Sequence, residues 1–112
     1  MGSKHLSDGS DECVLVPRHE YEHLARFAAE AYVPPMPEPD ERGLYPAIES
    51  CRVLTARDFV GRRLALGLTR AELAAIAGLR PSTVERVESG KHATTQRTLA
   101  KLESAFKRAL RR

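Results

Sequence analysis

The chain has 112 residues and a formal net charge of +3, and a chain of this length can bury one core or two very small ones. Its charge is divided unevenly: residues 55–112 hold 13 Lys and Arg against 5 Asp and Glu, whereas residues 1–54 hold 5 against 10. A basic half is typical of proteins that bind a polyanion. The acidic half indicates either solvation of the chain or a basic protein partner.

Targeting and membrane signals are missing from the sequence. No apolar run approaches the ~18 residues of a membrane span, and the N-terminus has no signal-peptide pattern. We therefore expect a cytoplasmic protein that does not associate with a membrane. Cys13 and Cys51 are then reduced and act as small hydrophobic residues, with a disulfide between them as the less favoured alternative.

The N-terminal part begins with residues 1–11, which are polar and rich in Gly, Ser and Asp, and which we predict to be a mobile tail. Glu12–Val16 is a β-branched run stopped by a proline, so it predicts a short strand. Arg18–Tyr32 predicts a helix. Its apolar stripe consists of Tyr21, Leu24, Ala25, Ala28 and Tyr32. Because one strand and one helix cannot bury their faces alone, residues 12–32 are expected to mediate dimerisation or partner binding.

A proline-rich stretch follows, with four prolines among residues 33–40, and residues 33–45 are predicted to be an extended linker. Helical signals resume at Pro46, which suits a first helical position. An apolar face then continues to Gly67. It consists of Ile48, Cys51, Thr55, Phe59 and Leu66. This face favours one long helix over residues 46–66, and a shorter helix capped by Thr55 is the alternative.

Two short helices are predicted around a tight turn. Thr69 is a good N-cap, and Glu72 completes a T-x-x-E capping box. Gly78 suits the left-handed residue at a helix end, Pro81 suits the first turn of the next helix, and Gly90 closes that helix. The apolar positions of the pair are Leu73, Ala74, Ala77, Val84 and Val87. This pattern predicts a helix-turn-helix, whose second helix can enter a major groove of DNA.

A polar loop then leads to an N-cap at Thr94 or Thr95 and to a last helix with Leu99, Leu102 and Phe106 on its buried face. That helix ends in KRALRR, and cations are favourable at a helix C-terminus.

The pattern "GLT-x-x-ELA…AG…V-x-x-VE-x-GK" resembles the DNA-binding domain of the phage-repressor family (Cro/C1, XRE type), over roughly Ala56 to Leu110. The resemblance implies a mainly α chain, in which a four-to-five-helix repressor-like domain at residues 46–112 follows a short β-strand and a helix. Domains of this family usually have a fifth helix. Only four are expected after the linker, so the strand–helix unit is expected to cover the remaining core surface, in cis or in trans.

The same resemblance assigns the DNA contacts. The residues expected to face base edges are Arg80, Pro81, Ser82, Thr83 and Arg86. The residues expected to contact phosphates are Thr69, Arg70, Ser89, Lys91 and His92. Arg binds guanine bidentately, whereas Pro81 offers only apolar contact where the family often has Gln or Ser. For each exposed cation the alternative is a solubilising charge. The resemblance also implies a structural ion pair between Arg63 and Glu88.

His19, Glu20 and His23 form a literal H-E-x-x-H, the signature of zinc peptidases. With Tyr21 at the centre of the buried stripe, both histidines would lie ~160–200° away on the solvent face. A third ligand and a closed cleft are also required, and ~30 structured residues can hardly build them. We therefore expect no metal site, no cofactor and no enzyme, with a zinc metallopeptidase as a distant alternative.

The N-terminal run "VLVPRHEYEHL" resembles the opening of many bacterial antitoxins. Together with the linker, the "LYPAIE" segment and the repressor-type domain, it is similar to antitoxins of the HigA-like class. This resemblance implies a protein that neutralises a small basic RelE/ParE-like toxin and represses its own operon as a homodimer on a palindromic operator. The alternative is a stand-alone repressor without a toxin partner, in which residues 12–32 serve only dimerisation or core coverage.

Overall fold

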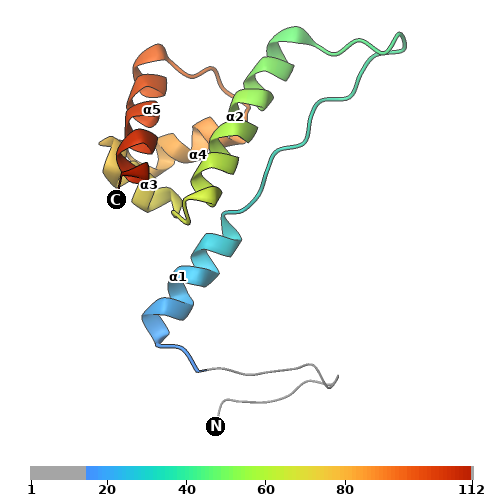
Figure 1. The fold of residues 1–112 in the computed structure, drawn as a ribbon. Helices are drawn as coiled ribbons and strands as arrows, with labels where there is room; N and C mark the ends of the chain where they lie inside the picture. The colour runs from blue at the N-terminus through green and yellow to red at the C-terminus, as the bar shows by residue number, and fades with distance from the viewer. Residues whose placement is uncertain (1–14, 112) are drawn as a thin grey trace, which may run out of the picture.

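The computed structural model describes residues 15–111, and this part of the chain contains five helices and no strand (Figure 1). The helices are α1 (Arg18–Ala29), α2 (Ala47–Ala65), α3 (Arg70–Ala77), α4 (Pro81–Ser89) and α5 (Gln96–Leu110). The predicted mobile tail and residues 12–14 of the predicted strand lie outside the described residues. Leu15 and Val16, the described end of that strand, have no regular structure.

Helices α2 to α5 pack around one apolar core, as the periodicity of their sequences indicates. The core residues are Phe59, Leu73, Ala74, Ala77, Val84, Val87, Leu102, Ala105 and Phe106. Helix α3 lies against both α4 and α5, and α4 lies against α2. The rings of Phe59 and Phe106 stack with their centroids 5.7 Å apart, which joins α2 to α5.

Helix α2 runs without interruption from its N-cap, Pro46, to Ala65. This confirms the prediction of one long helix, and the alternative of a shorter helix capped by Thr55 is wrong. The expected buried face is wrong at its start, because the side chain of Ile48 is 71% exposed and Cys51 is exposed as well. The buried edge begins instead at Val53. The end of α4 meets α2 there, and apolar spacing along one helix does not show where a partner helix crosses it.

Helix α1 binds the bundle through a different face from the one that its sequence predicts. Tyr21 and Leu24 are 62% and 52% exposed, and no residue of α1 is buried. The half-buried side chains are those of His23, Phe27 and Glu30, at spacings of i, i+4 and i+7. The expectation that both histidines face solvent is therefore wrong for His23. Within the monomer α1 contributes no residue to the buried core.

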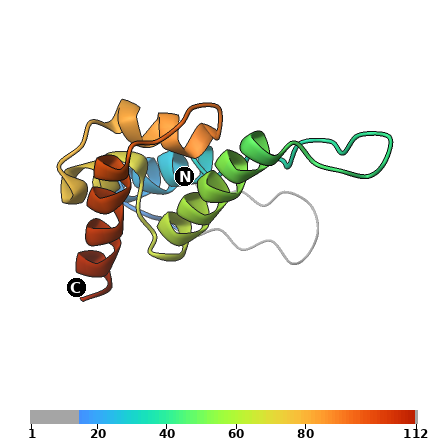
Figure 2. The same cartoon turned by 90° about the horizontal axis from the view of Figure 1, so that it is seen from above.

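The helix also ends earlier than expected, at Ala29, and residues 31–45 contain no helix or strand. Both views show this segment projecting beyond the N-terminal end of α2 (Figures 1 and 2). It has one side-chain hydrogen bond to the bundle and one turn that is stabilised within the segment itself. Arg57 Nη1 donates to the carbonyl oxygen of buried Pro34 at 2.9 Å. The Asp40 carboxylate accepts from the backbone N–H groups of Arg42 and Leu44 at 2.9 and 2.8 Å. Among the described helices, none is both long and apolar enough to cross a membrane.

Candidate nucleic-acid interface

The turn between α3 and α4 is determined by local chemistry at both of its ends. Thr69 Oγ1 accepts from the Glu72 N–H at 3.2 Å while the Thr69 N–H donates to Glu72 Oε1 at 2.8 Å, so the predicted capping box forms. Gly78 ends α3 at a φ of 71°, and the Leu79 N–H donates to the Ala74 carbonyl oxygen at 2.9 Å. This Schellman arrangement ends α3, and α4 begins two residues after Leu79, at Pro81.

Helix α4 has one buried and one solvent-facing side. Val84 and Val87 are 1% and 6% exposed and hold the helix on the core. Ser82, Arg86 and Ser89 follow at i, i+4 and i+7 on the opposite side, where Ser82 and Arg86 are exposed and Ser89 is half-buried. A side chain on this outward strip can reach a groove of DNA without disturbing the core.

The remaining residues expected to face bases lie around the start of α4. Arg80 is the N-cap residue, is exposed and makes no side-chain capping bond. Pro81 occupies the first turn, where its missing N–H has no intrahelical partner, and Thr83 is half-buried. The structure therefore brings all five of these residues to the solvent-facing side of α4 or to its N-terminal end.

The end of α4 brings three of the expected phosphate ligands together. Gly90, in the left-handed conformation, lets the chain turn where a Cβ atom would approach the Val53 backbone to 3.3 Å. Ser89 Oγ donates to the Arg86 carbonyl oxygen at 2.8 Å and accepts from the Lys91 N–H at 3.2 Å. The side chains of Lys91 and His92 are exposed. This loop has a free cation and a fixed backbone, as a phosphate contact requires.

The other expected phosphate ligands, at the start of α3, are already engaged within the protein. Thr69 is 5% exposed and its hydroxyl caps the helix. Arg70 Nε donates to Glu88 Oε1 at 3.0 Å, and the Arg70 backbone N–H donates to Glu30 Oε1 at 2.7 Å. The sequence analysis did not identify the role of Glu30. The two partners are 40 residues apart, and no local spacing rule connects them.

The buried ion pair lies beneath this end of the interface. Arg63 is 0% exposed, and its Nε and Nη2 atoms donate to Glu88 at 2.6 and 3.1 Å. Its Nη1 donates to the Leu68 carbonyl oxygen at 2.8 Å, and its Nη2 also donates to the Glu30 carbonyl oxygen. The carboxylate of Glu88 thus joins α2, the start of α3 and the end of α4. The sequence analysis predicted one arginine partner for Glu88, namely Arg63, and the structure shows a second one, Arg70.

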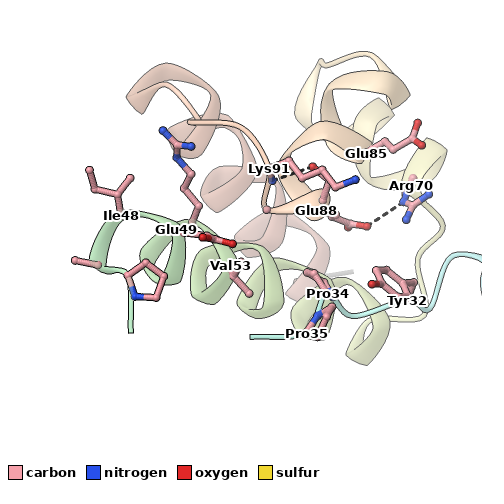
Figure 3. A pocket seen from close by; sticks show the side chains of 15 residues that line it. Tyr32, Pro34, Pro35, Ile48, Glu49, Val53, Arg70, Glu85, Glu88 and Lys91 are labelled. Carbon is pink, nitrogen blue, oxygen red and sulfur yellow. Dashed lines mark hydrogen bonds and ion pairs between the residues drawn. The ribbon is translucent and has the colours of Figure 1, made fainter. Parts of the chain in front are cut away.

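A groove of about 1050 Å³ opens beside these residues, between the segment after α1, the start of α2 and the end of α4 (Figure 3). Tyr32 and Pro34 line it from the linker side, and Arg70, Ser89 and Lys91 line it from the side of the expected phosphate contacts. The chain that leaves α1 therefore runs next to the expected DNA-binding surface.

Helix α5 is attached to α2 by a surface arginine. Arg62 donates from Nη1 and Nη2 to the Glu103 carboxylate at 2.9 and 2.8 Å, and its guanidinium lies 4.4 Å from the centroid of the Phe106 ring.

Two carboxyl groups of the bundle have lowered pKa values. The hydrogen bonds from Arg62 lower the pKa of Glu103. Burial by itself raises the pKa of Glu72, but hydrogen bonds from Thr69 and His23 outweigh it and lower that pKa as well.

Acid is therefore expected to destabilise the fold. A carboxyl whose folded pKa is lowered contributes stability above its unfolded pKa of about 4.3, and that contribution is lost as the pH falls through the folded value. Urea unfolding midpoints should fall between about pH 5 and about pH 3. Glu103→Gln should flatten this dependence, whereas Glu38→Gln, on the exposed linker, should leave it unchanged. Equal pH profiles for the wild type and Glu103→Gln would contradict the assignment.

The H-E-x-x-H sequence of α1 does not assemble a metal site among residues 15–111, where no group of three or more His, Cys, Asp or Glu side chains is placed to hold a metal ion. His23 Nε2 lies 3.1 Å from Glu72 Oε1 instead. Cys13 lies outside the described residues, so the structure does not address its pairing with Cys51.

Comparison with known families agrees with this geometry. Residues 62–111 match the model of a family described as helix-turn-helix. No curated protein and no solved structure matches the chain. The matched residues contain α3, the turn, α4 and α5. This part of the chain is thus similar to helix-turn-helix domains, and the match supports a sequence-specific DNA-binding regulator.

Proposed function

We propose that the protein is a DNA-binding antitoxin that represses its own operon as a homodimer on a palindromic operator. The observation that carries the DNA-binding part is the outward strip of Ser82, Arg86 and Ser89 on α4, within the matched helix-turn-helix. We assign residues 46–112 to DNA binding, residues 33–45 to a linker and residues 12–32 to dimerisation or partner binding. The site in α4 is one for recognition and not for catalysis.

In the proposed complex α4 lies in the major groove. Arg80 and Arg86 would donate to guanine edges, Ser82 and Thr83 would accept or donate more permissively, and Pro81 would contact a thymine methyl group. Lys91, Ser89 and His92 would contact the DNA backbone, as the loop geometry at the end of α4 allows. Two such helices reading a palindrome must lie about one helical turn apart, which is the reason for proposing a homodimer.

The antitoxin role rests on the N-terminal half. The run "VLVPRHEYEHL" is similar to antitoxin openings, and α1 presents exposed Tyr21 and Leu24 side chains that the bundle does not cover. Residues 1–54 hold 5 basic and 10 acidic side chains, a balance that suits a small basic partner of the RelE/ParE type. Such a protein would act in the cytoplasm, where its operator is found.

The decisive experiment is purification of the tagged full-length protein expressed from its own operon, followed by mass spectrometry of the bound material and footprinting of the operon promoter. A stoichiometric small basic protein that is lost in the Leu24→Asp variant, with promoter protection retained, would support the antitoxin. Glu22→Asp, on the same exposed helix, is the matched control. Promoter protection without any bound protein would leave a stand-alone repressor, and absence of protection would reject the DNA-binding role.

A further inference from the structure

The N-terminus of α3, where a DNA phosphate is expected, holds a carboxylate of the protein itself. The Arg70 backbone N–H donates to Glu30 Oε1 at 2.7 Å, and the same oxygen lies 4.0 Å from Nη1 of Arg63. The side chain of Glu30 is 13% exposed, so it is enclosed at this position. Free N–H groups and the helix dipole favour any anion at a helix N-terminus, and a carboxylate and a phosphate use the same donors.

Glu30 is brought to this position by a docked but weakly attached helix. Besides the carboxylate, the polar contacts of the helix are the Glu30 carbonyl oxygen, which accepts from Arg63, and the contact between His23 and Glu72 at 3.1 Å. His23 and Glu72 are 40% and 45% exposed, and exposed polar pairs contribute little to stability. No residue of α1 is buried and Phe27 is its one half-buried apolar side chain, so release of α1 would expose a limited apolar surface; the next contact along the chain is the hydrogen bond from Arg57 to Pro34.

We propose that Glu30 is an intramolecular competitor of the DNA backbone, so that α1 and the segment after it must leave the start of α3 before a phosphate can bind there. The inference rests on the proposed DNA-binding function. Tyr32 and Pro34, which follow Glu30, line the same groove as Lys91, so the same displacement would widen the space beside the second expected phosphate contact (Figure 3). The apparent affinity for DNA is then the affinity of the undocked form multiplied by the fraction of molecules in which α1 is undocked.

The test compares the full-length wild type with Glu30→Ala, using a duplex of the operon promoter and a mixed-sequence duplex of equal length. Glu30→Ala should bind both duplexes about two- to fivefold more tightly, because an anion at this helix end no longer competes. The slope of log affinity against log salt should be the same for both proteins, because the wild type in the complex has released Glu30 and contacts the same phosphates. The matched control is Glu22→Ala, which removes the same charge from the exposed side of α1 and should change the affinity for either duplex much less.

A second variant separates competition from a folding defect. His23→Ala removes the contact of α1 with Glu72 and leaves Glu30 in place, so it should also raise the affinity for both duplexes. In NMR spectra, the α1 signals of the wild type with added duplex should move toward those of free Glu30→Ala. Equal affinities for the wild type, Glu30→Ala and His23→Ala would overturn the inference alone. Absence of DNA binding in every variant would overturn it together with the proposed function.

Discussion

Replacing Glu88 with alanine is expected to lower the free energy of unfolding by about 3–5 kcal/mol, because it leaves a buried guanidinium without its counter-ion. Arg63 is 0% exposed, and both of its bonds to Glu88 would be lost. Arg70 would lose the same partner, but its side chain is 21% exposed and can reach water. Since small domains are stable by about 5–15 kcal/mol, a large share of the molecules could unfold near physiological temperature. Urea unfolding followed by circular dichroism measures the loss.

Two further variants show that the loss comes from the buried charge. Glu85→Ala removes an exposed carboxylate from the same helix and should change stability by less than about 0.5 kcal/mol. The double variant Arg63→Met with Glu88→Leu removes both charges and should recover most of the stability, because apolar residues of similar size replace buried ion pairs at little cost. A small loss in Glu88→Ala, or a double variant as unstable as the single one, would show that the pair is not a structural centre of the domain.

Replacing Arg86 with alanine is expected to weaken binding to the operator by about 1–3 kcal/mol and to relax the preference at one base pair. Arg86 is exposed on the outward side of α4, one turn after Ser82, so its loss should leave the fold intact. Titration of operators carrying each base substitution in turn would identify the position that no longer discriminates. Binding to mixed-sequence DNA should change much less.

Lys91→Ala gives the contrasting result that a phosphate contact requires. It should weaken binding to all sequences to a similar extent and lower the slope of log affinity against log salt by about one unit. If Arg86→Ala and Lys91→Ala behaved alike, both cations would act through charge alone, and direct reading of bases by α4 would be rejected.

Local chemistry made the helix-turn-helix predictable. Thr69 with Glu72, Gly78, Pro81 and Gly90 each have a side chain or a backbone freedom that one local conformation needs, and the structure shows each of them in that conformation. The apolar spacing of α3, α4 and α5 was equally reliable, because α3 packs on both other helices and all three contribute residues to one core. The pair of Arg63 and Glu88 was different. It came from the family resemblance, since nothing in the spacing of the two residues indicates that they meet.

The sequence by itself thus determined where the helices of the helix-turn-helix begin and end, because caps, turns and periodicity act within a few residues. Only the tertiary structure decided which face of α1 contacts the bundle and where the buried edge of α2 starts. It also placed the carboxylate of Glu30 at the N-terminus of α3, where the sequence analysis had predicted a contact with a DNA phosphate. The physical reason is that contacts between distant segments, such as His23 with Glu72, depend on how the chain folds back on itself, which the spacing of residues within one helix does not specify.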